Sequence, residues 1–76
     1  MTPKEASKIT AWLAARGYAY RLGQDMPGIM VNTNYGGQYP SAEVYRAHGE
    51  IGTYIRRFHK EVKTEPRGHW TGLWIW

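Results

Sequence analysis

The chain contains no cysteine, which at a length of 76 residues restricts what it can fold into. Neither a disulfide nor a thiolate zinc site is available to hold such a chain together. A chain this short buries only about 60% of its unfolded surface, so one thin apolar core has to stabilise it. We therefore expect one domain over residues 1–76, with no metal and no cofactor. Because disulfides are typical of oxidising compartments, their absence favours a cytoplasmic protein.

The first residues predict a helix from Pro3 to Arg16. Thr2 supplies an N-cap hydroxyl, proline occupies the first helical position, and Glu5 completes a capping box. Apolar residues then recur at helical spacing, namely Ala6, Ile9, Trp12 and Leu13. Gly17 favours the left-handed conformation that ends a helix.

Three later segments have the alternating pattern of half-buried strands. The first two run from Tyr18 to Leu22 and from Ile29 to Thr33, and a short turn-rich segment separates them. A loop of this length favours an antiparallel hairpin. At the end of the chain, residues 69–76 place tryptophan at 70, 74 and 76 in alternation with Thr71, Leu73 and Ile75. We expect this segment to add a third strand.

A second helix is predicted over residues 41–63. Ser41 is a suitable N-cap, and residues recur every three or four positions at Val44, His48, Ile51, Ile55, Phe58 and Val62. Gly49 and Gly52 would each cost about 1 kcal/mol in a helix interior. Residues 42–46 are therefore open to interpretation as a strand, with the helix beginning near Glu50. The segment 64–68, which contains Pro66, is predicted to end the helix and turn the chain.

Together these elements predict an α+β fold in the order α-β-β-α-β. The sheet would have three antiparallel strands, and the helices would cover one of its faces. The alternative order, with a strand at residues 42–46, is α-β-β-β-α.

No arrangement along the sequence indicates a catalytic or metal site. His48 and His59 are eleven residues apart, which is about 16 Å along a helix and too far for one metal ion. We interpret His48 as half-buried at the edge of the core and His59 as solvated. No serine has a paired base at a recognisable spacing. A small ribonuclease that uses arginine, lysine, histidine and tyrosine, with His48, His59 or His69 essential, is the enzymatic alternative.

Basic and aromatic residues supply the candidate binding residues. Four Trp, six Tyr and one Phe make up 14% of the chain, more than a thin core requires. We expect Trp12, Tyr54 and Phe58 in the core, which leaves other aromatic residues near the surface. Trp, Tyr and Arg supply much of the binding energy at protein interfaces, and aromatic rings also stack on nucleobases. The partner-binding candidates are Tyr35, Tyr39, Arg56, Arg57, Lys60, Lys63, Arg67 and Trp70.

The leading hypothesis is a non-enzymatic protein that blocks the surface of a host protein or nucleoprotein complex. The alternative is direct binding of nucleic acid, because Arg56, Lys60 and Lys63 would share one face of the second helix, with Arg57 beside them. A homodimer built on exposed tryptophans is equally open. The longest apolar runs are too short to cross a bilayer, so no membrane partner is expected.

Two resemblances accompany these observations. The alternative order α-β-β-β-α resembles the double-stranded-RNA-binding-like fold of HicA-type toxins over Ala6–Val62, but the glycine-serine-histidine motif of those toxins is missing. The whole chain resembles small phage-encoded inhibitors such as anti-CRISPR proteins. It shares with them a small size, a lack of cysteine and motifs, a capped alanine-rich helix and a high aromatic content. This resemblance implies inhibition by binding rather than by catalysis.

Overall fold

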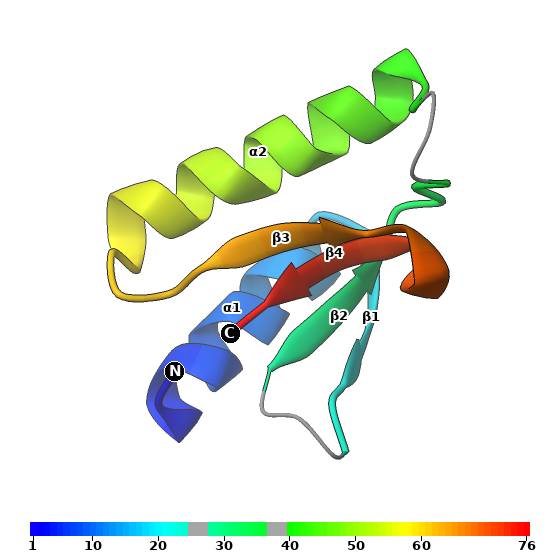
Figure 1. Ribbon diagram of the computed structural model, residues 1–76. Helices are drawn as coiled ribbons and strands as arrows, with labels where there is room; N and C mark the ends of the chain where they lie inside the picture. The colour runs from blue at the N-terminus through cyan, green and yellow to red at the C-terminus, as the bar shows by residue number, and fades with distance from the viewer. Residues whose placement is uncertain (25–27, 37–39) are drawn as a thin grey trace.

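The computed structural model describes residues 1–24, 28–36 and 40–76, apart from the side chain of Trp70. The elements are α1 (Pro3–Ala15), β1 (Ala19–Leu22), β2 (Ile29–Asn32), α2 (Ala42–Phe58), β3 (Thr64–Arg67), the 3-10 turn η1 (Gly68–Trp70) and β4 (Gly72–Ile75). The strands form one antiparallel sheet in the spatial order β1-β2-β4-β3 (Figure 1). The α+β class is confirmed. The predicted number and order of strands were wrong, because the described chain has four strands in the order α-β-β-α-β-β.

α1 begins at Pro3 as predicted and ends at Ala15, one residue before the predicted end, with Arg16 as its C-cap. The Thr2 side chain accepts a hydrogen bond from the Glu5 N–H, and the Glu5 carboxylate accepts one from the Thr2 N–H, both at 3.1 Å. This capping box satisfies two of the backbone donors at the start of the helix. Gly17 follows the helix with a φ of 81°, which glycine adopts without a steric penalty.

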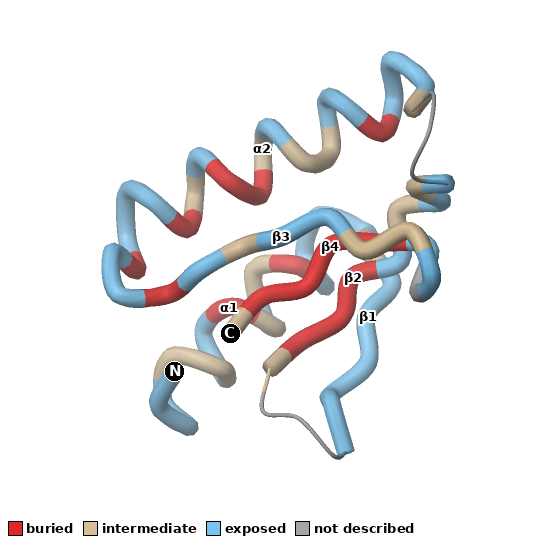
Figure 2. Tube along the Cα trace, viewed as in Figure 1, coloured by how far each residue is buried: buried red, intermediate tan, exposed pale blue. Residues whose placement is uncertain are grey.

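The core lies between the two helices and one face of the sheet (Figure 2). Because side chains alternate along a strand, every second residue of β2 and β4 points towards the helices. The core cluster comprises Ile9, Leu13, Ile29, Val31, Ile51, Ile55, Val62, Leu73 and Ile75. Both helices therefore pack on the same face, as predicted. None of the helices described is long and apolar enough to span a bilayer.

α2 is one helix that begins after Ser41, so the strand interpretation of residues 42–46 was wrong. The Ser41 hydroxyl accepts a hydrogen bond from the Val44 N–H at 3.3 Å. The helix ends at Phe58 rather than at the predicted residue 63. The chain turns here because Val62 packs into the core. The main chain of Lys63 then exchanges two hydrogen bonds with that of Trp76, at 2.8 and 3.0 Å.

β3 occupies residues that were predicted to form a turn because of Pro66. A proline has no N–H to donate, so it is excluded from the middle of a sheet but tolerated in an edge strand. Among the strands that the structure describes, β3 lies at the edge and pairs with β4 alone. The sequence pattern alone does not show that this segment has a strand beside it.

β4 confirms the predicted C-terminal strand, but its side chains divide between two faces. Leu73 and Ile75 enter the core, whereas Trp74 lies opposite Met30 on the face away from the helices. Both Trp74 and Met30 are almost fully buried there, at 3% and 4% exposure. Gly72 is required because a Cβ at this position would collide with the carbonyl oxygen of Val31 in β2.

Candidate partner-binding surface

Four aromatic side chains form a row that joins α1, α2 and the segment between α1 and β1. We call this row the aromatic seam; it comprises Tyr18, Trp12, Tyr54 and Phe58. Trp12 and Tyr54 stack with ring centroids 4.2 Å apart and planes inclined by 4°. The ring of Tyr18 lies 6.3 Å from Trp12, and that of Phe58 lies 5.6 Å from Tyr54. Such pairs contribute about 0.5–1.5 kcal/mol beyond the area they bury. The seam therefore stabilises the packing of α1 against α2.

Polar groups hold one end of the aromatic seam in place. The Tyr18 hydroxyl donates a hydrogen bond to Glu50 at 2.8 Å, and Arg16 lies 3.4 Å from the same carboxylate. Burial and the Glu50 hydrogen bond together raise the pKa of Tyr18 to about 12. The guanidinium of Arg16 also lies 5.0 Å from the ring centre of Trp12. Within the described part of the chain, Trp12 thus contacts Tyr18, Tyr54 and Arg16.

His59, which caps the C-terminal end of α2, is buried at 6% exposure, so its expected solvation was wrong. Its Nδ1 lies 3.7 Å from Glu5 Oε2, and its Nε2 lies 2.9 Å from the Tyr54 hydroxyl. The backbone N–H of Thr2 holds the pKa of Glu5 below its usual range, and burial raises the pKa of Tyr54. His59 therefore links the start of α1 to the end of α2.

Phe58 continues the aromatic seam into solvent and is 67% exposed, although the sequence placed it in the core. Three exposed basic residues flank Phe58 in the sequence, namely Arg56, Arg57 and Lys60. The Arg57 guanidinium lies 6.0 Å from the Phe58 ring centre, and Arg56 bonds to the Thr53 hydroxyl at 3.4 Å. Within residues 1–24, 28–36 and 40–76, no recorded ion pair involves these cations. We call Arg56, Arg57, Phe58 and Lys60 the basic tip.

Two other basic candidates do not belong to the basic tip. Because α2 ends at Phe58, Lys60 and Lys63 do not continue the helical face that was predicted for them. Lys63 is exposed and precedes β3. Arg67 lies in β3 and pairs with Glu65 at 2.7 Å. The predicted basic stripe was therefore wrong beyond the end of α2.

The aromatic candidates that the sequence suggested, Tyr35, Tyr39 and Trp70, do not belong to the basic tip either. Tyr35 lies beside His48, with ring centroids 5.4 Å apart, near the beginning of α2. Tyr39 lies outside the described residues, and so does the side chain of Trp70. Phe58 was predicted to lie in the core and is 67% exposed, and Tyr20 is an exposed aromatic residue that was not among the candidates either. The charged neighbours of Phe58 give no signal of exposure, because Ile55 and Val62 also lie beside charged residues in the sequence and are buried.

The histidines occupy three different environments. His48 Nε2 lies 2.6 Å from the Thr33 hydroxyl, and burial lowers its pKa, in agreement with the predicted half-buried position. His59 hydrogen-bonds with Tyr54 and lies 3.7 Å from Glu5, whereas His69 is exposed in η1. Among the described residues, no group of three or more metal-ligating side chains is close enough to hold an ion.

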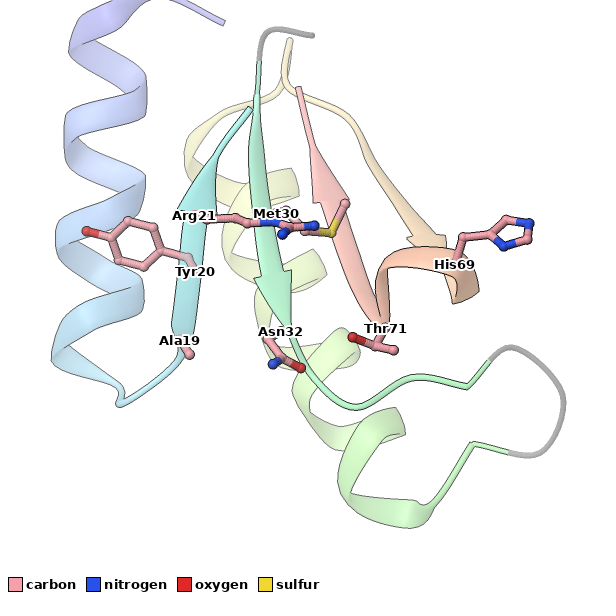
Figure 3. A pocket seen from close by; sticks show the side chains of 7 residues that line it. All are labelled: Ala19, Tyr20, Arg21, Met30, Asn32, His69 and Thr71. Atoms are coloured by element: carbon pink, nitrogen blue, oxygen red, sulfur yellow. The ribbon is translucent and has the colours of Figure 1, made fainter. Parts of the chain in front are cut away.

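The sheet face away from the helices carries a shallow hollow of about 370 Å³ (Figure 3). It is lined by Ala19, Tyr20, Arg21, Met30, Asn32, His69 and Thr71. Arg21 extends across β2 towards Met30, whereas the ring of His69 points away from the other side chains. The two basic groups therefore do not converge, as they would need to do to clamp one small anion.

Comparisons with models of known protein families, with curated protein sequences and with solved structures find no match.

Proposed function

We propose that this protein is a non-enzymatic binding protein that occupies an acidic surface of a partner protein through the basic tip. The 67% exposure of Phe58 carries this proposal. Burying such a ring in an interface contributes about 1.5–3 kcal/mol, the size of a binding hot spot. Arg57, whose guanidinium lies 6.0 Å from the ring centre, and the cations Arg56 and Lys60, which are nearby in the sequence, match an acidic partner, as does the net charge of +4. The resemblance to phage-encoded inhibitors supports the same mode of action, which is to block a host nucleic-acid-processing complex.

A protein partner fits this surface better than a nucleic acid does. Proteins that bind single strands stack successive nucleobases on several aromatic faces. In the aromatic seam Trp12 and Tyr54 already stack on each other, which leaves Phe58 as its one strongly exposed ring among the described residues. Nucleic acid is the alternative result of the test, and four phosphate contacts would give a slope of about −3.6 in log K against log[salt].

The experiment is capture of partners from host lysate with the full chain as bait, with and without nuclease. Phe58→Ala is compared with Tyr45→Ala, because both side chains lie on α2 and both are 67% exposed. We expect a nuclease-resistant protein partner whose affinity falls about 10- to 100-fold with Phe58→Ala. Tyr45→Ala should have little effect. If both variants lose affinity for the partner equally, or if both retain it, the basic tip is not the binding surface.

A second comparison tests the charge of the basic tip. Arg56→Glu combined with Lys60→Glu should abolish binding of the captured partner without unfolding the protein. Arg46→Glu is the control for charge reversal, because Arg46 lies on the same helix about 15 Å from Arg56. Unchanged affinity in the double variant would refute the electrostatic part of the proposal. If the captured partner is no longer recovered after nuclease treatment, direct binding of nucleic acid is favoured.

A further inference from the structure

The two edges of the sheet present different main-chain groups to solvent. At the β1 edge, the Gly23 N–H donates to the Gly28 carbonyl oxygen at 3.0 Å, in line with the pairing of Arg21 with Met30. Along an antiparallel strand, successive residues direct their N–H and C=O groups to opposite sides. Residues 19, 21 and 23 therefore bond to β2. The main-chain groups of Tyr20 and Leu22 point out of the sheet.

The β3 edge is blocked against a further strand. The main chain of Lys63 hydrogen-bonds to that of Trp76, which directly follows β4. The same alternation therefore directs the main-chain groups of Thr64 and Pro66 away from the sheet. Pro66 has no N–H, and proline at such a position is one way in which proteins prevent edge-to-edge pairing. β1 contains neither a proline nor a lysine. Among the residues described, nothing pairs with its outer side.

The side chains on β1 are also available to a partner. All four residues of β1 are exposed (Figure 2), and Tyr20 and Leu22 reach 40% and 61% exposure. Leu22 forms one wall of a mostly apolar hollow of about 300 Å³, lined also by Met1, Thr2, Pro3, Ala6, Gly23, Gly28 and Trp76. An added strand would therefore find both hydrogen-bonding groups and an apolar hollow beside the strand, the two features that strand addition uses.

A second copy of the chain is a poor occupant of this edge. Antiparallel self-pairing that uses all the outward groups places Tyr20 opposite Leu22 of the other copy. That register places Arg21 directly opposite Arg21 of the second copy. The two residues form a non-hydrogen-bonded pair, in which opposite side chains lie closest together. Like charges in this position are destabilising. Arg21 therefore acts against self-pairing and favours an acidic residue opposite it.

We propose that the β1 edge binds an extended peptide segment with the pattern apolar–acidic–apolar, as an added antiparallel strand. The acidic residue lies opposite Arg21, and the two apolar residues lie opposite Tyr20 and Leu22. The segment bonds to the main chain of these last two residues. This site is separate from the basic tip, so either proposal can fail without the other.

The test uses two acetylated and amidated pentapeptides, Thr-Val-Glu-Val-Thr and Thr-Val-Lys-Val-Thr, titrated into the folded chain. NMR follows the backbone amide signals. We expect the Tyr20 and Leu22 amides to shift and exchange more slowly, with the Glu peptide binding about fivefold more tightly than the Lys peptide. In Arg21→Glu, the preference between the two peptides should reverse. Leu22→Pro should abolish binding, because it removes an outward N–H while leaving the bonds to β2.

Three results would overturn this inference. The first is no shift at Tyr20 and Leu22 with millimolar Glu peptide. The second is equal affinity of the unmodified chain for both peptides, which needs no variant to fold. The third is a dimer of the unmodified chain that Leu22→Pro dissociates, because a second copy would then already occupy the edge. Circular dichroism of each variant establishes whether it is folded.

Discussion

Replacing Gly49 with alanine should stabilise the protein, and the structure supplies the magnitude. Gly49 lies within the continuous helix α2 and is exposed. Apart from its two chain neighbours and the backbone of the same helix, no atom lies within 4 Å of the position that a Cβ would occupy. Alanine is favoured over glycine in a helix interior by about 0.8–1.0 kcal/mol. For a chain of 76 residues, the total stability is about 4–11 kcal/mol. One substitution should therefore change it measurably.

The assay is thermal unfolding followed by circular dichroism. The unfolding entropy of a chain of 76 residues is about 0.16 kcal/mol per kelvin, so Gly49→Ala should raise the Tm by about 5–6 °C. Gly72→Ala is the opposite control, because its Cβ would collide with the carbonyl of Val31 in the middle of the sheet. We expect it to lower the stability by about 1–3 kcal/mol. An unchanged or lower Tm for Gly49→Ala would refute the description of α2 as one uninterrupted helix with an open surface at this position.

Two predictions concern pH. Burial lowers the pKa of His48 from 6.5, so the unfolded chain binds a proton more readily than the folded one, and stability should fall as the pH drops below about 6.5. His48→Gln should flatten this dependence between pH 7 and pH 5 in urea unfolding, and an unaltered slope would contradict the assignment. The pKa of Tyr18 is raised from 10.0 to about 12, so the folded state holds this proton more tightly, and stability should decline as the pH rises from 10 to 12. Tyr18→Phe should remove that decline and cost about 1 kcal/mol at neutral pH through the lost hydrogen bond to Glu50. A variant that loses stability at high pH as steeply as the unmodified chain would show that Tyr18 is not the responsible group.

Part of the candidate surface could be predicted from the sequence. Arg56, Arg57 and Lys60 were identified from their charge and their clustering, and all three lie in the basic tip. Phe58 was assigned to the core because it continues the spacing of Ile51 and Ile55. Phe58 is the last residue of α2 and keeps this spacing, yet it is 67% exposed, so the spacing does not show where the core ends. The aromatic seam could not be predicted either, because it joins residues of two helices whose relative placement is set by packing.

For the edge strand β1, too, the sequence predicted one part and tertiary structure decided the other. Its alternating pattern predicted a strand, and the hairpin with β2 followed from the short loop between them. Which side of β1 is open depends on the order β1-β2-β4-β3, in which the last strand lies between β2 and β3. No local pattern contains this order, because it results from long-range pairing between segments far apart in the chain.

The sequence by itself determined the local elements of this protein. The capping box of α1, Gly17 at its end, the Ser41 cap of α2 and the alternation in β1, β2 and β4 all depend on neighbouring residues, whose preferences act within a few positions. Tertiary structure decided where α2 ends, that the segment containing Pro66 is a strand, and that His59 is buried while Phe58 is exposed. These features depend on which segments the core brings together. Burying Val62 and pairing Lys63 with Trp76 outweigh the helical pattern of the residues that follow Phe58.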